Sequence, residues 1–132
     1  MKFKELLFHD SSDSANTTLL SYINSIADLQ KIPLWQVMEA NYMFNLSVTE
    51  FARICQRSVA TFKREFYEYY HTTPGKWLTR NRLEYAKHLL DGSKRSVSEI
   101  AYECGFENLT HFSRIFKEKY ASSPLQYRKK VK

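Results

Sequence analysis

The sequence predicts an all-α fold in which two similar units, each a short helix, a turn and a longer helix, are joined by a long connecting helix. The first observation behind this prediction is an internal repeat, in which residues 47–78 resemble residues 96–128. The second is that each copy opens with the pattern of a capped helix, and the third is that positive charge is concentrated in the repeated part. A repeat of this kind marks a structural unit that occurs twice, so it guides the interpretation of the other elements.

The repeat can be followed residue by residue. In the first half of each copy, Ser47, Val48, Glu50, Ala52 and Cys55 match Ser96, Val97, Glu99, Ala101 and Cys104. After one extra residue in the second copy, Phe62, Arg64, Phe66, Glu68, Tyr70 and Pro74 match Phe112, Arg114, Phe116, Glu118, Tyr120 and Pro124. Two copies are too few for a solenoid. They favour a protein that performs one local task at two places.

Each copy begins with a capping box. In Ser47-x-x-Glu50 and Ser96-x-x-Glu99, the serine side chain accepts from an early helix N–H and the glutamate reaches back to the serine N–H. A short helix with one apolar face follows, and it ends at a break around residues 56–57 or 105–107. Gly105 suits a left-handed turn, whereas the first copy has Gln56 at the equivalent position.

A longer helix follows each break. Its apolar residues are Val59, Phe62, Phe66 and Tyr70 in the first copy and Leu109, Phe112, Phe116 and Tyr120 in the second. The opposite face of each is polar and basic. A short helix, a tight turn and a longer helix with a polar outer face make a helix-turn-helix.

The remaining elements complete the predicted organisation. Helical spacing predicts a helix over Thr18–Leu29, and a second one after Pro33 with Leu34, Trp35, Met38 and Tyr42 on its apolar face. Pro74–Asp91 is expected to form the connecting helix, with Trp77, Leu78, Leu83, Ala86 and Leu90 turned toward the two units. The chain is therefore divided into residues 1–16 (a linker or the end of a missing N-terminal domain), 17–46 (helices bracing the first unit), 47–73 (first helix-turn-helix), 74–92 (connecting helix) and 93–132 (second helix-turn-helix and basic tail).

The charge distribution points to a polyanion as the partner. Residues 1–46 hold three Lys/Arg and five Asp/Glu, a net charge of −2, whereas residues 47–132 hold seventeen and nine, a net charge of +8. A basic domain attracts nucleic acid through phosphate neutralisation and counterion release. Basic charge alone is weak evidence, but its combination with a duplicated helix-turn-helix favours DNA.

Other function classes lack their motifs. The glycines are Gly75, Gly92 and Gly105, so no glycine-rich phosphate loop exists, and neither G-x-S-x-G nor H-E-x-x-H occurs. The histidines have no metal-ligand spacing with the two cysteines, which are expected to be buried free thiols. No apolar run long enough for a membrane span and no signal segment is present. We therefore expect no enzyme activity, no cofactor, no metal and no membrane association.

Residues 47–130 resemble the DNA-binding domain of the AraC/XylS family of bacterial transcription regulators. The resemblance is carried by Ile100-Ala101, Gly105-Phe106, Phe112-Ser113-Arg114, Phe116-Lys117, Ser123-Pro124 and Tyr127-Arg128, and residues 82–93 are similar to the end of the family's connecting helix. It implies a homeodomain-like, bipartite all-α fold. The family usually has glycine after each recognition helix, where this chain has His71 and Ala121. Alanine tolerates a left-handed backbone poorly, so the second recognition helix is expected to end with a different geometry.

The resemblance implies that the two longer helices contact double-stranded DNA. The expected contacts are Ala60, Thr61, Lys63, Arg64 and Tyr67 from the first, and Asn108, Thr110, His111, Ser113, Arg114 and Lys117 from the second. Two alternatives explain basic residues without DNA contact. Arg64 and Arg114 could pair with Glu68 and Glu118 four residues on, and the lysines at 129, 130 and 132 could be a solvated tail.

The family also implies the wider setting. RNA polymerase is a candidate second partner, the bacterial cytoplasm and nucleoid are the expected location, and the effector domain of such regulators is expected to be missing from this chain. The competing interpretation is a basic helical interaction module that binds an acidic protein or RNA. An RNA-binding surface would more often expose stacking aromatics, whereas most of the aromatics here fall on the apolar helix faces.

Overall fold

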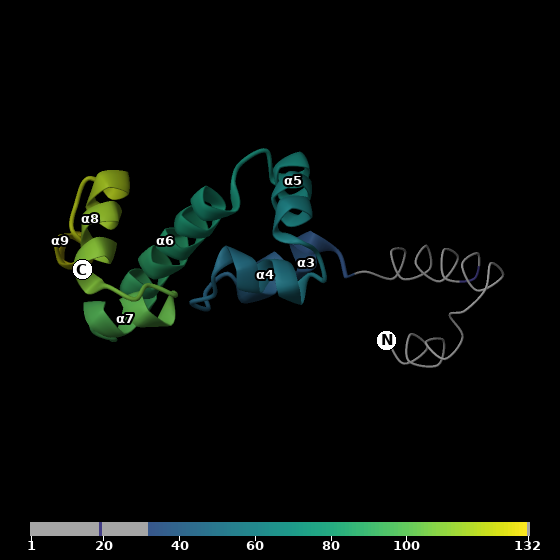
Figure 1. The fold of residues 1–132 in the computed structure, drawn as a ribbon. Coiled ribbons are helices and arrows are strands. Elements are labelled where there is room, and N and C mark those ends of the chain that lie inside the picture. Colours follow the sequence, from purple (N-terminus) through teal and green to yellow (C-terminus); the bar gives the residue numbers. More distant parts are fainter. Residues whose placement is uncertain (1–18, 20–31, 132) are drawn as a thin grey trace. The chain divides into compact units, whose positions relative to one another are not determined.

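The computed structural model describes Leu19 and residues 32–131, and in this part of the chain it contains α-helices and no strand (Figure 1). The helices are α3 (Leu34–Asn41), α4 (Val48–Ile54), α5 (Val59–Tyr70), α6 (Pro74–Gly92), α7 (Val97–Glu103), α8 (Leu109–Tyr120) and α9 (Pro124–Val131). The all-α prediction is confirmed for these residues. The predicted linker over residues 1–16 and nearly all of the predicted helix over Thr18–Leu29 lie outside them.

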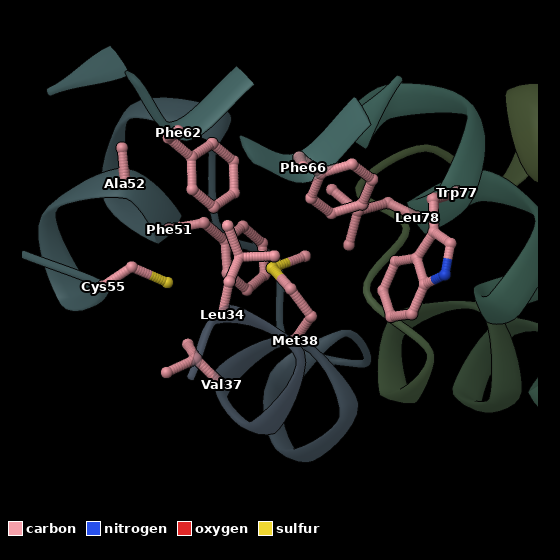
Figure 2. Close-up of a cluster of buried hydrophobic side chains, with 10 residues drawn as sticks. All are labelled: Leu34, Val37, Met38, Phe51, Ala52, Cys55, Phe62, Phe66, Trp77 and Leu78. Carbon is pink, nitrogen blue, oxygen red and sulfur yellow. The ribbon is translucent and has the colours of Figure 1, made fainter. Parts of the chain in front are cut away.

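Residues 33–132 form one unit, whose described part has two hydrophobic cores. The first core consists of Leu34, Val37, Met38, Phe51, Ala52, Cys55, Phe62, Phe66, Trp77 and Leu78. Figure 2 shows Phe62 and Phe66 of α5 facing Leu34 and Met38 of α3 across this core. The second core consists of Leu83, Ala86, Leu90, Ile100, Ala101, Cys104, Phe106, Phe112 and Phe116. The two predicted helix-turn-helix motifs, α4–α5 and α7–α8, each contribute to a different core.

The connecting helix α6 belongs to both cores. Trp77 and Leu78 near its start are buried in the first core, and Leu83, Ala86 and Leu90 further along are buried in the second. These are the five residues that the sequence predicts to face the units. Each half of α6 is held by apolar burial, and the whole helix therefore fixes one unit to the other.

The repeat extends further than the sequence alone indicates. Leu34 and Val37 of α3 precede Leu83 and Ala86 of α6 by the same offset that separates the two capping serines, and both pairs are buried. At its other end, α6 starts at Pro74 as α9 starts at Pro124. The second half of α6 is thus the first helix of the second unit, and its first half is the last helix of the first unit.

The short helices α4 and α7 form as predicted. In both, the serine Oγ accepts from the glutamate N–H at 3.1 Å, and the glutamate Oε1 accepts from the serine N–H at 2.8 Å in α4 and 2.9 Å in α7. These bonds lower the pKa of both glutamates, Glu50 and Glu99, because they favour the charged carboxylate. A pKa lowered in the folded state adds stability above the unfolded-state pKa, and this contribution is lost as the pH falls through the folded-state pKa.

The two longer helices of the repeat, α5 and α8, end with the same geometry. His71 after α5 and Ala121 after α8 both adopt left-handed backbone, with φ of 59° and 63°. The expectation that α8 ends differently is therefore wrong. The backbone N–H of Ala121 donates to the carbonyl of Lys117 at 2.8 Å, and Ser122 beside it is buried, so packing imposes a turn that alanine alone disfavours. Gln56 also adopts left-handed backbone, φ 58°, at the position where the second copy has Gly105.

One further expectation is corrected. Trp35 was expected on the apolar face of α3, but it is 45% exposed because the buried face runs through Leu34, Val37 and Met38 instead. Lys129 and Lys130 are exposed, as the solvated alternative expects, and they lie on helix α9.

The two thiols behave as predicted. Cys55 and Cys104 are free and buried, one in each core. Burial raises the pKa of the Cys104 thiol to about 12, which leaves it protonated and unreactive. Among the helices that the structure describes, none has the length and apolarity to cross a bilayer.

Candidate nucleic-acid interface

The first candidate surface is the outer face of α5. Phe62 and Phe66 are fully buried and anchor the helix in the first core. The five predicted contact residues lie on its other side: Ala60, Lys63, Arg64 and Tyr67 are exposed, and Thr61 is half-buried. Ser58 caps the helix, with its Oγ accepting from the Thr61 N–H at 3.2 Å. The sequence thus produces a rigid helix with a polar, cationic outer face.

The outer face of α8 is the equivalent surface in the second unit. Phe112 and Phe116 are fully buried and anchor it in the second core. Of the six predicted contact residues, Asn108, Thr110, His111, Arg114 and Lys117 are exposed and Ser113 is half-buried. The structure therefore gathers each predicted set on one accessible helix face.

Local hydrogen bonds organise the α8 surface. The Nη2 of Arg114 lies 2.8 Å from the Nδ1 of His111, one turn earlier on the helix. The Oδ1 of Asn108 caps α8 by accepting from the His111 N–H at 2.9 Å. Asn108 is therefore also a structural residue, and its Nδ2 is the side-chain donor that the cap leaves on this surface.

The salt-bridge explanation for the two repeated arginines does not hold. Within residues 32–131, neither Arg64 nor Arg114 forms an ion pair with the glutamate four residues on; the ion pairs there are Arg57–Glu65, Arg95–Glu103 and Glu84–Lys119. The exposed guanidinium groups of Arg64 and Arg114 are therefore available to an outside anion or base.

The first half of α6 forms the surface between the two outer faces. Lys63 and Tyr67 of α5 line a hollow of about 290 Å³ together with Gly75 at the start of α6. Gly75 also lines an adjacent groove of about 780 Å³, whose other lining residues are Thr73, Lys76, Thr79, Arg80, Leu83, Ile115, Glu118 and Lys119. Three of these residues are cationic and come from α6 and α8. The sequence pattern did not point to Lys76 or Lys119, and the helical period of α6 is the signal that could have placed Lys76 near Arg80.

Arg128 has a structural role. The guanidinium group of Arg128 on α9 donates to the backbone carbonyls of Leu90 (3.4 Å), Ser93 (3.2 Å) and Arg95, at the end of α6. A cation at the last carbonyls of a helix is well placed against its dipole. Thus the Tyr127-Arg128 motif serves the fold. In the described part of the chain, no cluster of His, Cys, Asp or Glu could hold a metal ion.

The chain is similar to known regulators over most of its length. A family model described as "Helix-turn-helix domain" matches residues 44–130. The thermoregulatory protein LcrF of Yersinia pestis is 30% identical over 128 residues, and the transcriptional activator RhaS of an Enterobacter species is 33% identical over 105 residues. These matches cover 97% and 80% of this chain but 47% and 37% of the relatives, so the chain spans about half of their length or less.

Solved structures agree with the sequence comparison. The DNA-binding domain of AdpA, crystallised with a target DNA, has a TM-score of 0.70 and 31% identity, covering 74% of this chain and 91% of that one. An AraC-type regulator from Chromobacterium violaceum has a TM-score of 0.64 and 28% identity, covering 83% of this chain and 96% of that one. These relatives are transcription regulators and not enzymes. The chain belongs to the AraC/XylS family of bacterial transcription regulators and carries its helix-turn-helix DNA-binding domain.

Proposed function

We propose that this chain binds double-stranded DNA in a sequence-specific manner, with α5 and α8 in successive major grooves. The observation that carries the proposal is the pair of exposed polar faces, each held by two buried phenylalanines, on either side of the basic first half of α6. Recognition helices that dock on one face of B-DNA lie about 34 Å, or one helical turn, apart. One chain would then bind an asymmetric site of about 15–20 bp, with DNA bending where needed for register.

The two faces should prefer different sequences. The first presents Lys63 and Arg64, whereas the second presents His111, Ser113 and Arg114. Arginine favours guanine because two parallel hydrogen bonds reach O6 and N7. Selection of binding sites from random duplexes tests the proposal: one enriched element with two unlike halves is expected. No enrichment of any duplex would contradict it.

The five-part organisation extends the proposal to the whole chain. Residues 47–73 and 93–132 each supply a helix-turn-helix, 74–92 connect them, 17–46 brace the first unit, and 1–16 link it to an effector domain of the longer regulator. The span of only about half of LcrF supports that last point. RNA polymerase is the second partner that we propose for the regulator in the bacterial cytoplasm.

The alternative is a basic module for RNA or an acidic protein. Against RNA stands the burial of the aromatic rings Phe62, Phe66, Phe112 and Phe116, which removes them as stacking platforms. A gel shift at several salt concentrations with duplex, single-stranded and RNA competitors separates the cases. Preferential competition by the selected duplex is expected.

Replacement of Arg114 by alanine should weaken specific binding. The exposed guanidinium group is held by His111 on the outer face of α8, so we expect a loss of about 1–3 kcal/mol on the selected site and relaxed preference at one base pair. Binding to matched and singly substituted duplexes measures this, with thermal unfolding as the control for folding. Unchanged affinity and base preference in a folded variant would show that Arg114 makes no base contact.

Lys117 and Lys63 should behave differently. Lys117 lies one turn beyond Arg114, where a docked helix meets the DNA backbone. Lys117→Ala should therefore weaken binding to all duplexes alike, and it should reduce the slope of log affinity against log salt concentration by about one. Lys63→Ala should instead reduce affinity in a sequence-dependent way. Titrations against selected and scrambled duplexes at several salt concentrations distinguish the two. The same uniform loss in both variants would refute the contrast.

A further inference from the structure

The loop between α3 and α4, residues 42–47, is tied to the connecting helix by one arginine. The Nε of Arg82 donates to the carbonyl of Tyr42 at 2.7 Å, and its Nη2 donates to the carbonyl of Phe44 at 2.8 Å. Within residues 32–131, Arg82 forms no ion pair with a carboxylate. Its bonding capacity is directed at the backbone of the first unit.

The same loop lies against the turn of the second unit. A Cβ added to Gly105 would be 2.9 Å from the carbonyl oxygen of Met43 and 3.0 Å from the Nε of Arg82. Gly105 also has a φ of 97°, so it is required twice over, for the turn and for this close approach. Gln56, its counterpart in the first copy, has a φ of 58°, which lies in the left-handed region that residues with a side chain can adopt. The approach to Met43 and Arg82 is therefore a separate reason for glycine in the second copy.

A side-chain hydrogen bond joins the same two segments. The Nδ2 of Asn45 donates to the Oε1 of Glu107 at 2.6 Å, across 62 residues of sequence. A groove of about 370 Å³ beside this bond is lined from both units, by Asn45, Leu46, Ser47, Glu50, Thr79, Arg82, Gly105, Phe106, Glu107, Asn108 and His111. Asn108 and His111 begin the second recognition helix, so the contact adjoins the DNA-binding surface.

From these contacts we infer that Asn45, Arg82, Gly105 and Glu107 form an interlock that sets the rotation of one helix-turn-helix unit relative to the other. The interlock thereby makes the spacing between the two DNA half-elements a recognised feature. A single helix such as α6 holds two units at a distance but leaves bending and twisting to its own stiffness. A second connection beside it removes much of this freedom, because motion of one unit would stretch the Arg82 and Asn45 hydrogen bonds. These four are positioning residues, and the inference rests on the proposed function.

Spacing selectivity is the property that the interlock predicts. One base pair inserted between the half-elements rotates one by about 35° relative to the other. A rigid pair of units should lose much of its affinity for that site. A pair of units with a looser connection should reorient to contact both half-elements and lose less binding free energy. The ratio of affinities for native and altered spacing therefore measures the rigidity, independently of how strongly either unit binds.

The sharpest variant is Asn45→Asp, which places a carboxylate against Glu107 on an exposed loop and should not disturb folding. We expect the spacing ratio to fall by about threefold or more, because the net free energy of one hydrogen bond corresponds to a factor of about that size. Adding Glu107→Gln should restore it, because the glutamine amide can donate to the new aspartate. Arg82→Gln, which weakens both bonds to the loop, should lower the ratio further. Gln36→Glu adds the same charge on the exposed side of α3 and should leave the ratio unchanged.

Two readouts separate this inference from the proposed function. Affinities of the whole chain are measured on the selected duplex and on duplexes with one base pair added or removed between the halves. Spin labels at Tyr69→Cys and Leu125→Cys, both exposed, report the distance distribution between the units without DNA. It should broaden in Asn45→Asp and narrow again with Glu107→Gln. If the wild-type chain prefers no duplex, the proposed function fails, and the label distances still test the interlock. A spacing ratio and distance distribution that Asn45→Asp and Arg82→Gln leave unchanged would overturn the inference, as would a wild-type chain that binds specifically but ignores spacing.

Discussion

Replacement of Leu90 by aspartate is expected to cost about 4 kcal/mol or more, since it combines the loss of a buried leucine with the burial of a carboxyl group. Leu90 is fully buried in the second core, on the last part of α6. Leu83, on the same face, is a weaker test because it borders the groove that contains Arg80 and Lys119, where a carboxylate could find a cation. A domain of this size has a total stability of only about 5–15 kcal/mol.

The loss should appear as one cooperative transition at lower temperature. Because α6 contributes to both cores, we expect both units to unfold together, with a Tm lowered by more than about 15 °C. Thermal unfolding followed by circular dichroism measures this. His88→Asp is the matched control, since it adds the same side chain two residues earlier on α6 at an exposed position. Two separated transitions, with the first unit unaffected, would show that α6 does not couple the cores.

The sequence was sufficient where local rules decide the structure. The capping boxes at Ser47 and Ser96 and the buried residues of α6 follow from short-range spacing, and all are present. The polar faces of α5 and α8 follow from the same periodicity. The exposure of Trp35 does not follow from this periodicity. Helix α3 has only eight residues, three of them buried, so the spacing of its apolar residues does not define one buried face.

What the sequence could not provide are the contacts between distant residues. Arg82 and Arg128 look like two more basic surface residues, yet their partners are backbone carbonyls 33 to 40 positions away. A backbone acceptor has no sequence signature, so periodicity and charge cannot predict such bonds. The equivalence of α3 with the second half of α6 was hidden for a related reason. Leu34 and Val37 match the buried Leu83 and Ala86, but other positions differ, as in Met38 and Lys87 or Glu39 and His88.

The second large effect is expected when Thr79 and Arg80 are both replaced by glycine. Both side chains are exposed, so the change removes no core contact, and the lost helix propensity costs about 1 kcal/mol. The two glycines soften α6 between Leu78 of the first core and Leu83 of the second. Simultaneous docking depends on a high effective concentration of the second unit once the first is bound. Affinity for the full site should therefore fall, and the weak affinity for an isolated half-site should hardly change.

The interlock determines how large this fall is. With two connections between the units, softening α6 alone leaves Arg82 and Asn45 to hold their relative rotation, so the Gly-Gly variant should lose only part of the bipartite advantage. Adding Asn45→Asp to Gly-Gly removes the second connection, and the combined loss in full-site affinity should exceed the sum of the separate losses in free energy. Arg80→Ala is the control, because Arg80 lines the basic groove and contributes charge of its own. Circular dichroism establishes that each variant is folded. A Gly-Gly variant that binds the full site as tightly as Arg80→Ala, with or without Asn45→Asp, would mean that the DNA and not the protein sets the distance between the two recognition helices.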